Sequence, residues 1–176
     1  AREEGSSAQE NLARIGLGRA LLNLGEYEAA AEAVASVPTE FRYEVVHSTN
    51  TTREQNVVWN FNKSQQRFSV ANNEGGNGLP FRDSEDPRVL WAATGAAGFD
   101  GSTPQFNQQK YPARDSNVPL ATGIEARLIE AEAALQAGDL SEFASIHNAL
   151  RTGVELEPID VDLLSGNEEA NLDWQV

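Results

Sequence analysis

The chain lacks two residue types altogether, because no cysteine and no methionine occurs among its 176 residues. Without cysteine it has no disulfide framework, no thiolate nucleophile and no thiolate metal site. No apolar run approaches the ~18 residues of a membrane-spanning helix, so the sequence predicts no transmembrane segment of its own. Because the chain begins with Ala1 and no signal-peptide pattern follows, we expect a processed chain or an excerpt of a longer one.

Histidine and basic residues are also scarce. The two histidines, His47 and His147, lie far apart in the sequence without ligand-spaced partners, which gives a histidine metal site little support. Thirteen Lys and Arg residues against 27 Asp and Glu residues give a net charge of -14, divided as -5 over residues 1–100 and -9 over residues 101–176. This charge repels phosphates, so we expect no nucleic-acid partner.

The motifs of common catalytic sites are missing as well. The sequence holds no Gly-x-Ser-x-Gly nucleophile elbow, and its glycine-rich run at 75–78 has neither the lysine of a phosphate loop nor dinucleotide-binding spacing. The carboxylates at 125, 130 and 132 offer a glycosidase pair, but their place beside Arg127 favours an ion-paired helix face. Three acidic residues within 83–86 offer a calcium site, but a solvated turn is favoured. We therefore expect no enzymatic activity and no cofactor.

Helical periodicity concentrates towards the two ends of the chain. Apolar residues recur at helical spacing on both sides of Gly25 and again on both sides of Gly138, which predicts helix pairs over 10–37 and 123–152. Gly25 suits the left-handed position that ends a helix, and Thr122 precedes the second pair with capping-box spacing to a glutamate. The two pairs align with each other as a partial internal repeat of the tetratricopeptide type.

Between the pairs, residues 39–121 are rich in Gly, Asn, Gln, Ser and Pro and predict an irregular region. Short strands are predicted there at Phe41–Val46, Asn56–Phe61 and Arg67–Ala71. The expected fold class is therefore mainly α, with tetratricopeptide-like αα-hairpins and an irregular loop and short-strand region between them. The expected organisation is a single helical domain over 1–155, followed by an acidic, extended tail over 156–176.

Aromatic residues in irregular stretches suggest a binding site. A sugar ring presents an apolar face that stacks on an indole or phenol, while Asn and Gln amides bond its hydroxyls. Trp91 and Tyr111 occur in stretches rich in Gly, Pro and Asn, with Asn107 and Gln108 close to them in sequence. These four residues are the predicted ligand contacts, and a core role for Trp91 stays open as the alternative. Trp59, in an alternating Val, Trp and Phe segment, is expected to be core.

Six segments follow one another along residues 10–155 in a recognisable order. They are Gly25–Ala30 (GEYEAA), Glu54–Trp59 (EQNVVW), Asp86–Arg88 (DPR), Lys110–Pro112 (KYP), Glu125–Ala133 (EARLIEAEA) and Asn148–Arg151 (NALR). In this order the chain resembles the SusD/RagB family of nutrient-binding lipoproteins of the bacterial outer membrane. The last two segments carry most of the likeness.

The resemblance implies tetratricopeptide-like helix pairs that carry a ligand-facing region, and non-catalytic capture of glycans or other nutrients. It also implies a TonB-dependent SusC-like transporter as partner, and a place in the bacterial cell envelope, either at the outer-membrane surface, where the family is lipid-anchored, or in the periplasm. Family members are usually longer, and their lipid-bearing cysteine is absent from this sequence. The alternative function is a helical-repeat scaffold within a larger envelope or membrane-associated assembly, with no small-molecule ligand.

Overall fold

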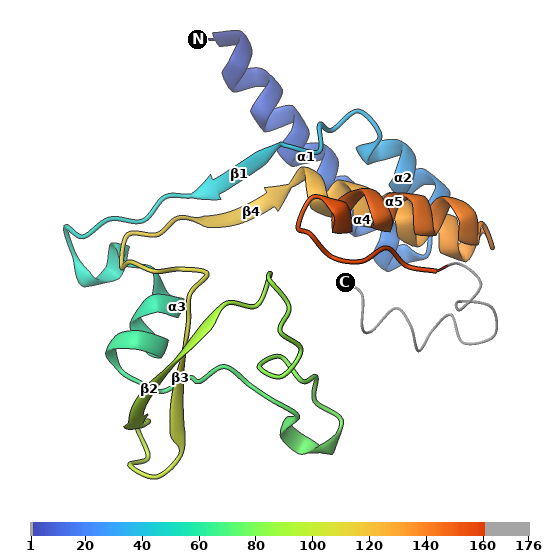
Figure 1. Cartoon of the computed structure of the whole chain (residues 1–176). Helices are drawn as coiled ribbons and strands as arrows, with labels where there is room; N and C mark the ends of the chain where they lie inside the picture. The colour runs from blue at the N-terminus through green and yellow to red at the C-terminus, as the bar shows by residue number, and fades with distance from the viewer. Residues whose placement is uncertain (1, 161–176) are drawn as a thin grey trace. The chain divides into compact units, whose positions relative to one another are not determined.

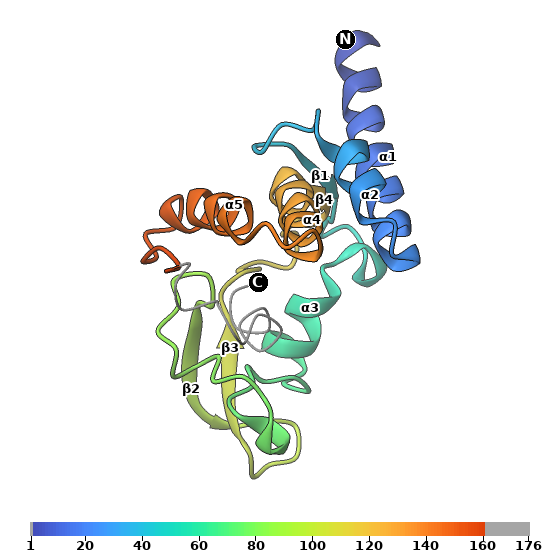
Figure 2. The same cartoon turned by 90° about the vertical axis from the view of Figure 1, so that its right-hand side faces the viewer.

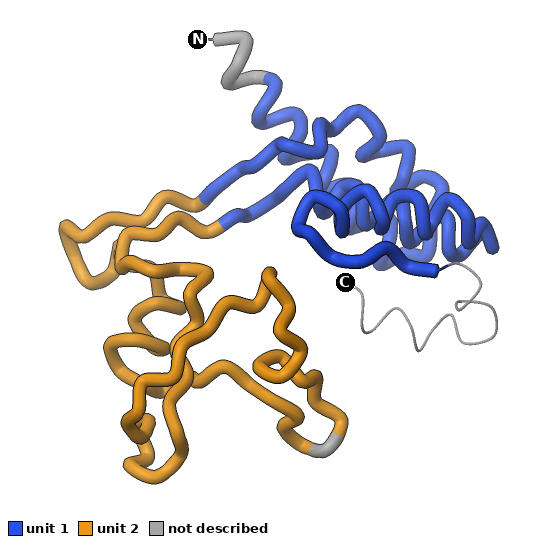
Figure 3. The backbone as a smooth tube through the Cα atoms, viewed as in Figure 1, with its two compact units in different colours: residues 1–44, 119–176 blue, residues 45–118 orange. Residues whose placement is uncertain are grey.

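A computed structural model describes residues 2–160 and divides the chain into two compact units. Unit 1 comprises Ala1–Glu44 and Pro119–Val176, and unit 2 comprises Val45–Val118 (Figures 1 and 3). Unit 2 is therefore inserted into the sequence of unit 1. Within residues 2–160, no helix is both long and apolar enough to cross a bilayer.

Unit 1 is built mainly from helices that pack as two pairs (Figure 1). The helices are α1 (Arg2–Leu24), α2 (Tyr27–Val34), α4 (Gly123–Gln136) and α5 (Leu140–Thr152). α1 packs on α2, α4 packs on α5, and α2 packs on α4. Gly25 and Gly138 follow α1 and α4 with φ of 77°, a left-handed conformation that glycine adopts without a Cβ penalty. The left-handed stop predicted at Gly25 is confirmed.

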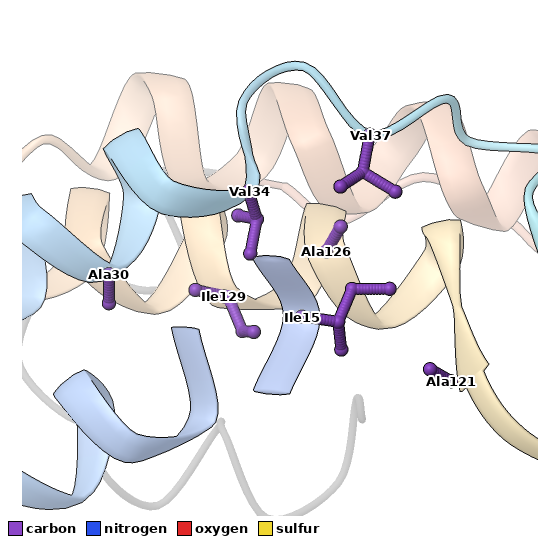
Figure 4. Packing of buried hydrophobic residues seen from close by; sticks show 7 residues of the cluster. All are labelled: Ile15, Ala30, Val34, Val37, Ala121, Ala126 and Ile129. Carbon is purple, nitrogen blue, oxygen red and sulfur yellow. The ribbon is translucent and has the colours of Figure 1, made fainter. Parts of the chain in front are cut away.

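The apolar core of unit 1 lies where α1, α2 and α4 meet (Figure 4). The cluster comprises Ile15, Ala30, Val34, Val37, Ala121, Ala126 and Ile129. Gly18 allows the helices to approach, because a Cβ at this position would lie 2.7 Å from Val34 Cγ1 and 3.1 Å from Ile129 Cδ1. A second cluster, between α4 and α5, includes Phe143 and Ala144. Small and branched residues thus hold the helices close together.

A two-stranded sheet of β1 (Arg42–Val45) and β4 (Val118–Thr122) leads the chain out of unit 1 and back into it. β1 falls within the predicted strand at 41–46, and α4 follows β4 directly. Thr122 Oγ1 accepts from Glu125 N at 3.2 Å, as the capping-box spacing predicts. The Glu125 carboxylate does not return to the cap but binds the Arg19 guanidinium of α1. A tertiary ion pair therefore replaces the second half of the predicted box.

Unit 2 consists of short elements and one β-hairpin (Figure 2). Its elements are η1 (Thr52–Glu54), α3 (Val57–Trp59), the π-helical turn η2 (Asn60–Ser64), η3 (Glu74–Gly76), β2 (Trp91–Ala97) and β3 (Pro104–Gln108). β2 and β3 pair antiparallel, with Trp91 opposite Gln108 and Ala97 opposite Pro104. The register shifts between Ala93 and Ala97, so the hairpin is bulged.

The interior of unit 2 is polar. Among its described residues the buried ones are Asn56, Asn62 and Gln105, which are 0%, 2% and 2% exposed. Asn62 Nδ2 donates to Phe68 O at 2.7 Å, and Asn62 Oδ1 accepts from Gln108 N at 3.0 Å. Gln105 Nε2 lies 2.9 Å from both Asn62 O and Phe68 O. Side-chain amides bonded to the backbone, rather than a buried apolar cluster, hold this unit in one geometry.

The predicted fold class is wrong. The chain has a mixed α/β fold with two small antiparallel sheets, and not a mainly α stack of tetratricopeptide-like αα-hairpins with an irregular region between them. The alanine-rich segment Trp91–Ala97 has little β propensity, yet it forms a strand because Pro104–Gln108 folds back to pair with it. The pairing partner, which lies outside the local pattern, decides the structure of this segment.

Two predicted strands of unit 2 are also wrong. Residues Asn56–Phe61 form a helical turn instead, because Asn56 Oδ1 caps it by accepting from Trp59 N at 2.9 Å. Arg67–Ala71 lies beside β3 but forms no strand, with Val70 N donating to Phe106 O at 3.0 Å.

The ends of the predicted helix pairs shift too. α1 begins at Arg2 rather than at residue 10, and α2 ends at Val34 rather than at 37. Arg127 Nη2 of α4 donates to Val34 O at the end of α2 and to Val37 O just after it, at 3.3 and 3.1 Å, and so ties α4 to this end of α2. Of the predicted tail, residues 161–176 lie outside the described residues. Residues 156–160 run beside α5, where Asn148 Oδ1 accepts from Ile159 N at 2.6 Å.

Candidate functional site

Trp91 begins β2 with its ring on the hairpin surface. The side chain is 38% exposed and meets the Phe106 ring edge-on, with 5.5 Å between ring centroids and 84° between planes. Trp91 lies opposite Gln108 in the antiparallel register, so the two side chains share one face of the hairpin. The indole therefore packs on one side and remains open to a ligand on the other.

Gln108 also fixes the position of Tyr111. Gln108 Oε1 accepts from Tyr111 N at 2.7 Å, and Gln108 Nε2 donates to Tyr111 O at 3.0 Å. Lys110 Nζ lies 5.8 Å from the centroid of the Tyr111 ring. Trp91, Gln108 and Tyr111 are therefore brought together, although both amide atoms of Gln108 are already bonded to the backbone.

Asn107 belongs to the opposite face of β3. Neighbouring strand residues point to opposite faces, and Asn107 Oδ1 accepts from Gln105 Nε2 at 3.0 Å. Asn107 thus joins the polar interior rather than the Trp91 face. Trp59, which was expected to be core, is half-buried, with the Arg114 guanidinium 5.5 Å from its ring centroid.

A hollow of about 530 Å³ lies beside the turn of the β2–β3 hairpin, within unit 2. It is lined by Phe61, Gln66, Arg67, Phe68, Ser69, Gly98, Phe99, Asp100, Thr103, Pro104 and Gln105. Phe68 is 58% exposed and Phe99 is 66% exposed. Two open phenyl rings among amide, hydroxyl and charged groups give this hollow the mixed lining typical of small-ligand sites, and its volume falls in the usual range.

Sequence reasoning missed both rings. Phe99 sits in a Gly-Phe-Asp-Gly turn, and Phe68 lies between Arg67 and Ser69. An aromatic residue in a short glycine-flanked turn is expected to be exposed, and this local signal was sufficient to identify Phe99 as an exposed ring. Phe68 carries no comparable signal, because its flanking residues are equally compatible with a half-buried strand.

The hairpin turn that carries Phe99 is held by Asp100. The Asp100 carboxylate accepts from the Thr103 hydroxyl and, at 2.9 Å each, from Ser102 N and Thr103 N. These bonds lower the pKa of Asp100 to about 2, the Thr103 hydroxyl contributing most. Phe99 N donates to Gln66 O at 2.8 Å, and the Arg67 guanidinium lies over the ring at 4.1 Å from its centroid. The turn is therefore well ordered by local bonds.

The groups weighed for catalysis or metal binding have other partners. His47 Nδ1 lies 3.0 Å from Glu54 O, and the His147 ring packs on Phe143 with 4.5 Å between centroids. Glu130 pairs with Arg127 at 3.1 Å. Over residues 2–160 the structure contains no group of three or more His, Cys, Asp or Glu side chains placed to hold a metal ion.

Comparison of the chain with protein-family models, curated proteins and solved structures gave no match. The candidate site is therefore defined by its own geometry.

Proposed function

We propose that the chain captures a polyhydroxylated ligand such as a glycan, without catalysing a reaction, and that the hollow beside the β2–β3 turn receives it. The observation that carries the proposal is the presence of two open phenyl rings, Phe68 and Phe99, on one hollow. A sugar ring stacks its apolar face on such a ring and offers its hydroxyls to neighbouring polar groups. Arg67, Thr103 and Gln66 supply those groups at the same hollow.

The backbone around both rings is ordered before a ligand arrives. Phe68 O accepts from two buried amides, Asn62 and Gln105. Phe99 is held through its own N–H and through the Asp100 turn. A site fixed in this way loses little conformational freedom on binding, which favours affinity for a weakly adhesive ligand such as a sugar.

The resemblance to the SusD/RagB family extends the proposal to nutrient uptake at the bacterial outer membrane, with delivery to a TonB-dependent SusC-like transporter. This extension rests on the six sequence segments alone. The alternative is a scaffold subunit of an envelope assembly with no small-molecule ligand. The Trp91, Gln108 and Tyr111 face is the second candidate contact surface on unit 2, and its open indole supports it.

The test is isothermal titration of the protein with a panel of soluble oligosaccharides. Phe99→Ala and Phe68→Ala should each weaken binding of the ligand found by about 1–2 kcal/mol, the scale of one lost stacking surface. Phe81→Ala is the matched control, because Phe81 is 39% exposed on the same unit and does not line the hollow. It should leave affinity unchanged.

Three results would count against the proposal. Absence of binding across the panel rejects a glycan ligand and favours the scaffold alternative. Loss of binding in Trp91→Ala with no effect of Phe68→Ala or Phe99→Ala moves the site to the Trp91 face. Turnover of any panel member that disappears on replacing one carboxylate overturns the non-catalytic assignment.

A further inference from the structure

Unit 1 contains a second hollow, which is larger than the one described in unit 2. It is a groove of about 1320 Å³ formed by α2, α4, α5 and the turns before α2 and α5. Its lining is Gly25, Glu26, Tyr27, Glu28, Ala29, Ala31, Glu32, Glu130, Ala133, Ala134, Gln136, Ala137, Asp139, Glu142 and Ile146. We call it the alanine groove.

The lining combines two chemical features. Five alanines, from α2, α4 and the residue after α4, contribute short apolar side chains, and Tyr27 and Ile146 add larger apolar surface to the same groove. Six carboxylates stand around it, and no Lys, Arg or His lines it. An apolar floor with acidic walls matches a ligand that is itself apolar along one side and cationic along the other.

Most of these carboxylates have no cation of their own. Within the described part of the chain, Glu26, Glu28, Glu32 and Glu142 form no ion pair. Glu130 is paired with Arg127, yet burial raises its pKa, and Glu142 raises it further, against the lowering effect of Arg127. Glu130 and Glu142 both line the groove, so negative charge gathers there, and an added cation would reduce the repulsion between these carboxylates.

We infer that the alanine groove binds a lysine- or arginine-rich segment of a partner protein. Charge complementarity selects this occupant. A single metal ion does not suit the groove, since its carboxylates are spread along three helices and residues 2–160 bring no three metal-ligating side chains together. A second copy of the chain carries a net charge of -14 and is repelled, and residues 161–176 contain four carboxylates and no basic residue.

Long basic side chains also suit the floor. The methylene stems of Lys and Arg cover apolar surface while their charged ends reach outward. Here the stems would lie on Ala29, Ala133 and Ala137, and the charged ends would meet Glu28, Glu32 and Glu142 at the walls. The partner segment thus gains apolar contact and ion pairs from the same residues.

The experiment measures fluorescence anisotropy of a short fluorescein-labelled peptide of alternating Lys and Ala residues, titrated with the full chain. The groove variant is Glu28→Gln with Glu32→Gln. The matched control is Glu40→Gln with Glu85→Gln, which removes the same charge from two exposed positions outside the groove. The groove variant should bind about tenfold more weakly and the control less than about twofold more weakly, because only the first pair touches the peptide.

A second variant tests the floor without altering charge. Ala137 is exposed and lines the groove, so Ala137→Leu should fill the space and weaken binding by about fivefold or more while the thermal unfolding midpoint stays near that of the parent chain. Equal loss of affinity in the groove and control charge variants would reveal attraction to net charge alone and overturn the inference. Absence of peptide binding at low salt, or full binding by Ala137→Leu, would overturn it as well.

Discussion

Arg19 of α1 and Glu125 of α4 form a two-pronged ion pair across 106 residues of sequence. Arg19 Nη2 lies 2.6 Å from Glu125 Oε2, and the same nitrogen donates to Leu120 O at 2.7 Å. The hydrogen bond to Glu125 is the main reason that the pKa of Arg19 is raised. The pair fastens the first helix of unit 1 to the place where the chain returns from unit 2.

We expect Arg19→Ala to lower the free energy of unfolding of unit 1 by about 1 kcal/mol. The side chains of Arg19 and Glu125 are 41% and 30% exposed, so water weakens the pair, while its bidentate geometry strengthens it. Urea unfolding followed by far-ultraviolet circular dichroism measures the change, because this signal reports the helices. Arg14→Ala, which removes an exposed pair with Glu10 inside α1, is the control and should cost less than about 0.5 kcal/mol. Equal effects of the two variants would contradict the prediction.

Two glycines of α1 should respond oppositely to alanine. A Cβ on Gly16 meets nothing within 4 Å, so Gly16→Ala should stabilise the chain by up to about 1 kcal/mol through helix propensity. A Cβ on Gly18 would press on Val34 and Ile129, so Gly18→Ala should destabilise it by about 1–3 kcal/mol. Thermal unfolding of both variants checks the close approach of α1, α2 and α4. Stabilisation by Gly18→Ala would mean that the helices are farther apart.

Two neighbouring residues of α4 should differ in how much stability is lost when each is replaced by alanine. Ile129 is 3% exposed within the main cluster, whereas Leu128 is only half-buried. Ile129→Ala should therefore cost about 2–4 kcal/mol by leaving a cavity, and Leu128→Ala should cost clearly less. The midpoints of urea unfolding measure both losses of stability, provided that the dependence of the unfolding free energy on urea concentration is unchanged. The reverse order would place the apolar stripe of α4 on the other side of the helix.

Acid should loosen the hairpin turn of unit 2 through Asp100. The folded pKa of Asp100, about 2, lies below its ordinary value of 3.8, so the unfolded state binds the proton more tightly. The stabilising contribution is complete above about pH 4 and is lost as the pH falls towards 2.

Asp100→Asn should remove this part of the acid dependence. Tryptophan fluorescence reports the change, since Trp59 and Trp91 both lie in unit 2. Asp115→Asn, at another exposed aspartate of unit 2, provides the comparison. The assignment would be refuted if the change in tryptophan fluorescence between pH 5 and pH 2.5 were the same in Asp100→Asn as in the parent chain.

Local signals predicted the parts of the fold that local bonds determine. The conformation of Gly25 and the cap at Thr122 each depend on a few adjacent residues, and both were evident in the sequence. The segment after Asn56 was wrongly predicted as a strand, because two valines and a tryptophan favour that structure. In the fold, the buried Asn56 side chain caps a helical turn instead. Asn56 also donates to Ser116 O at 2.8 Å, a contact across 60 residues that no local pattern contains.

The candidate site was predictable only in part, for a similar reason. Trp91 and Tyr111 could be recognised as aromatic residues in irregular segments, but their joint attachment to Gln108 depends on the hairpin register. Asn107 is adjacent to Gln108 in sequence, and yet its side chain lies on the other face of β3. The backbone position of Phe68 depends on side-chain amides of Asn62 and Gln105, which donate to Phe68 O from separate segments of the chain.

The insertion of unit 2 between β1 and β4 affects how the sequence of the protein can change in evolution. The chain leaves unit 1 along one strand and returns along the neighbouring strand of the same small sheet. The entropy of closing such an excursion grows only with the logarithm of its length, by about 0.6 kcal/mol for each doubling. Changes in the gene can therefore lengthen, shorten or exchange unit 2 at these two strands while the helices of unit 1 keep the same sequence.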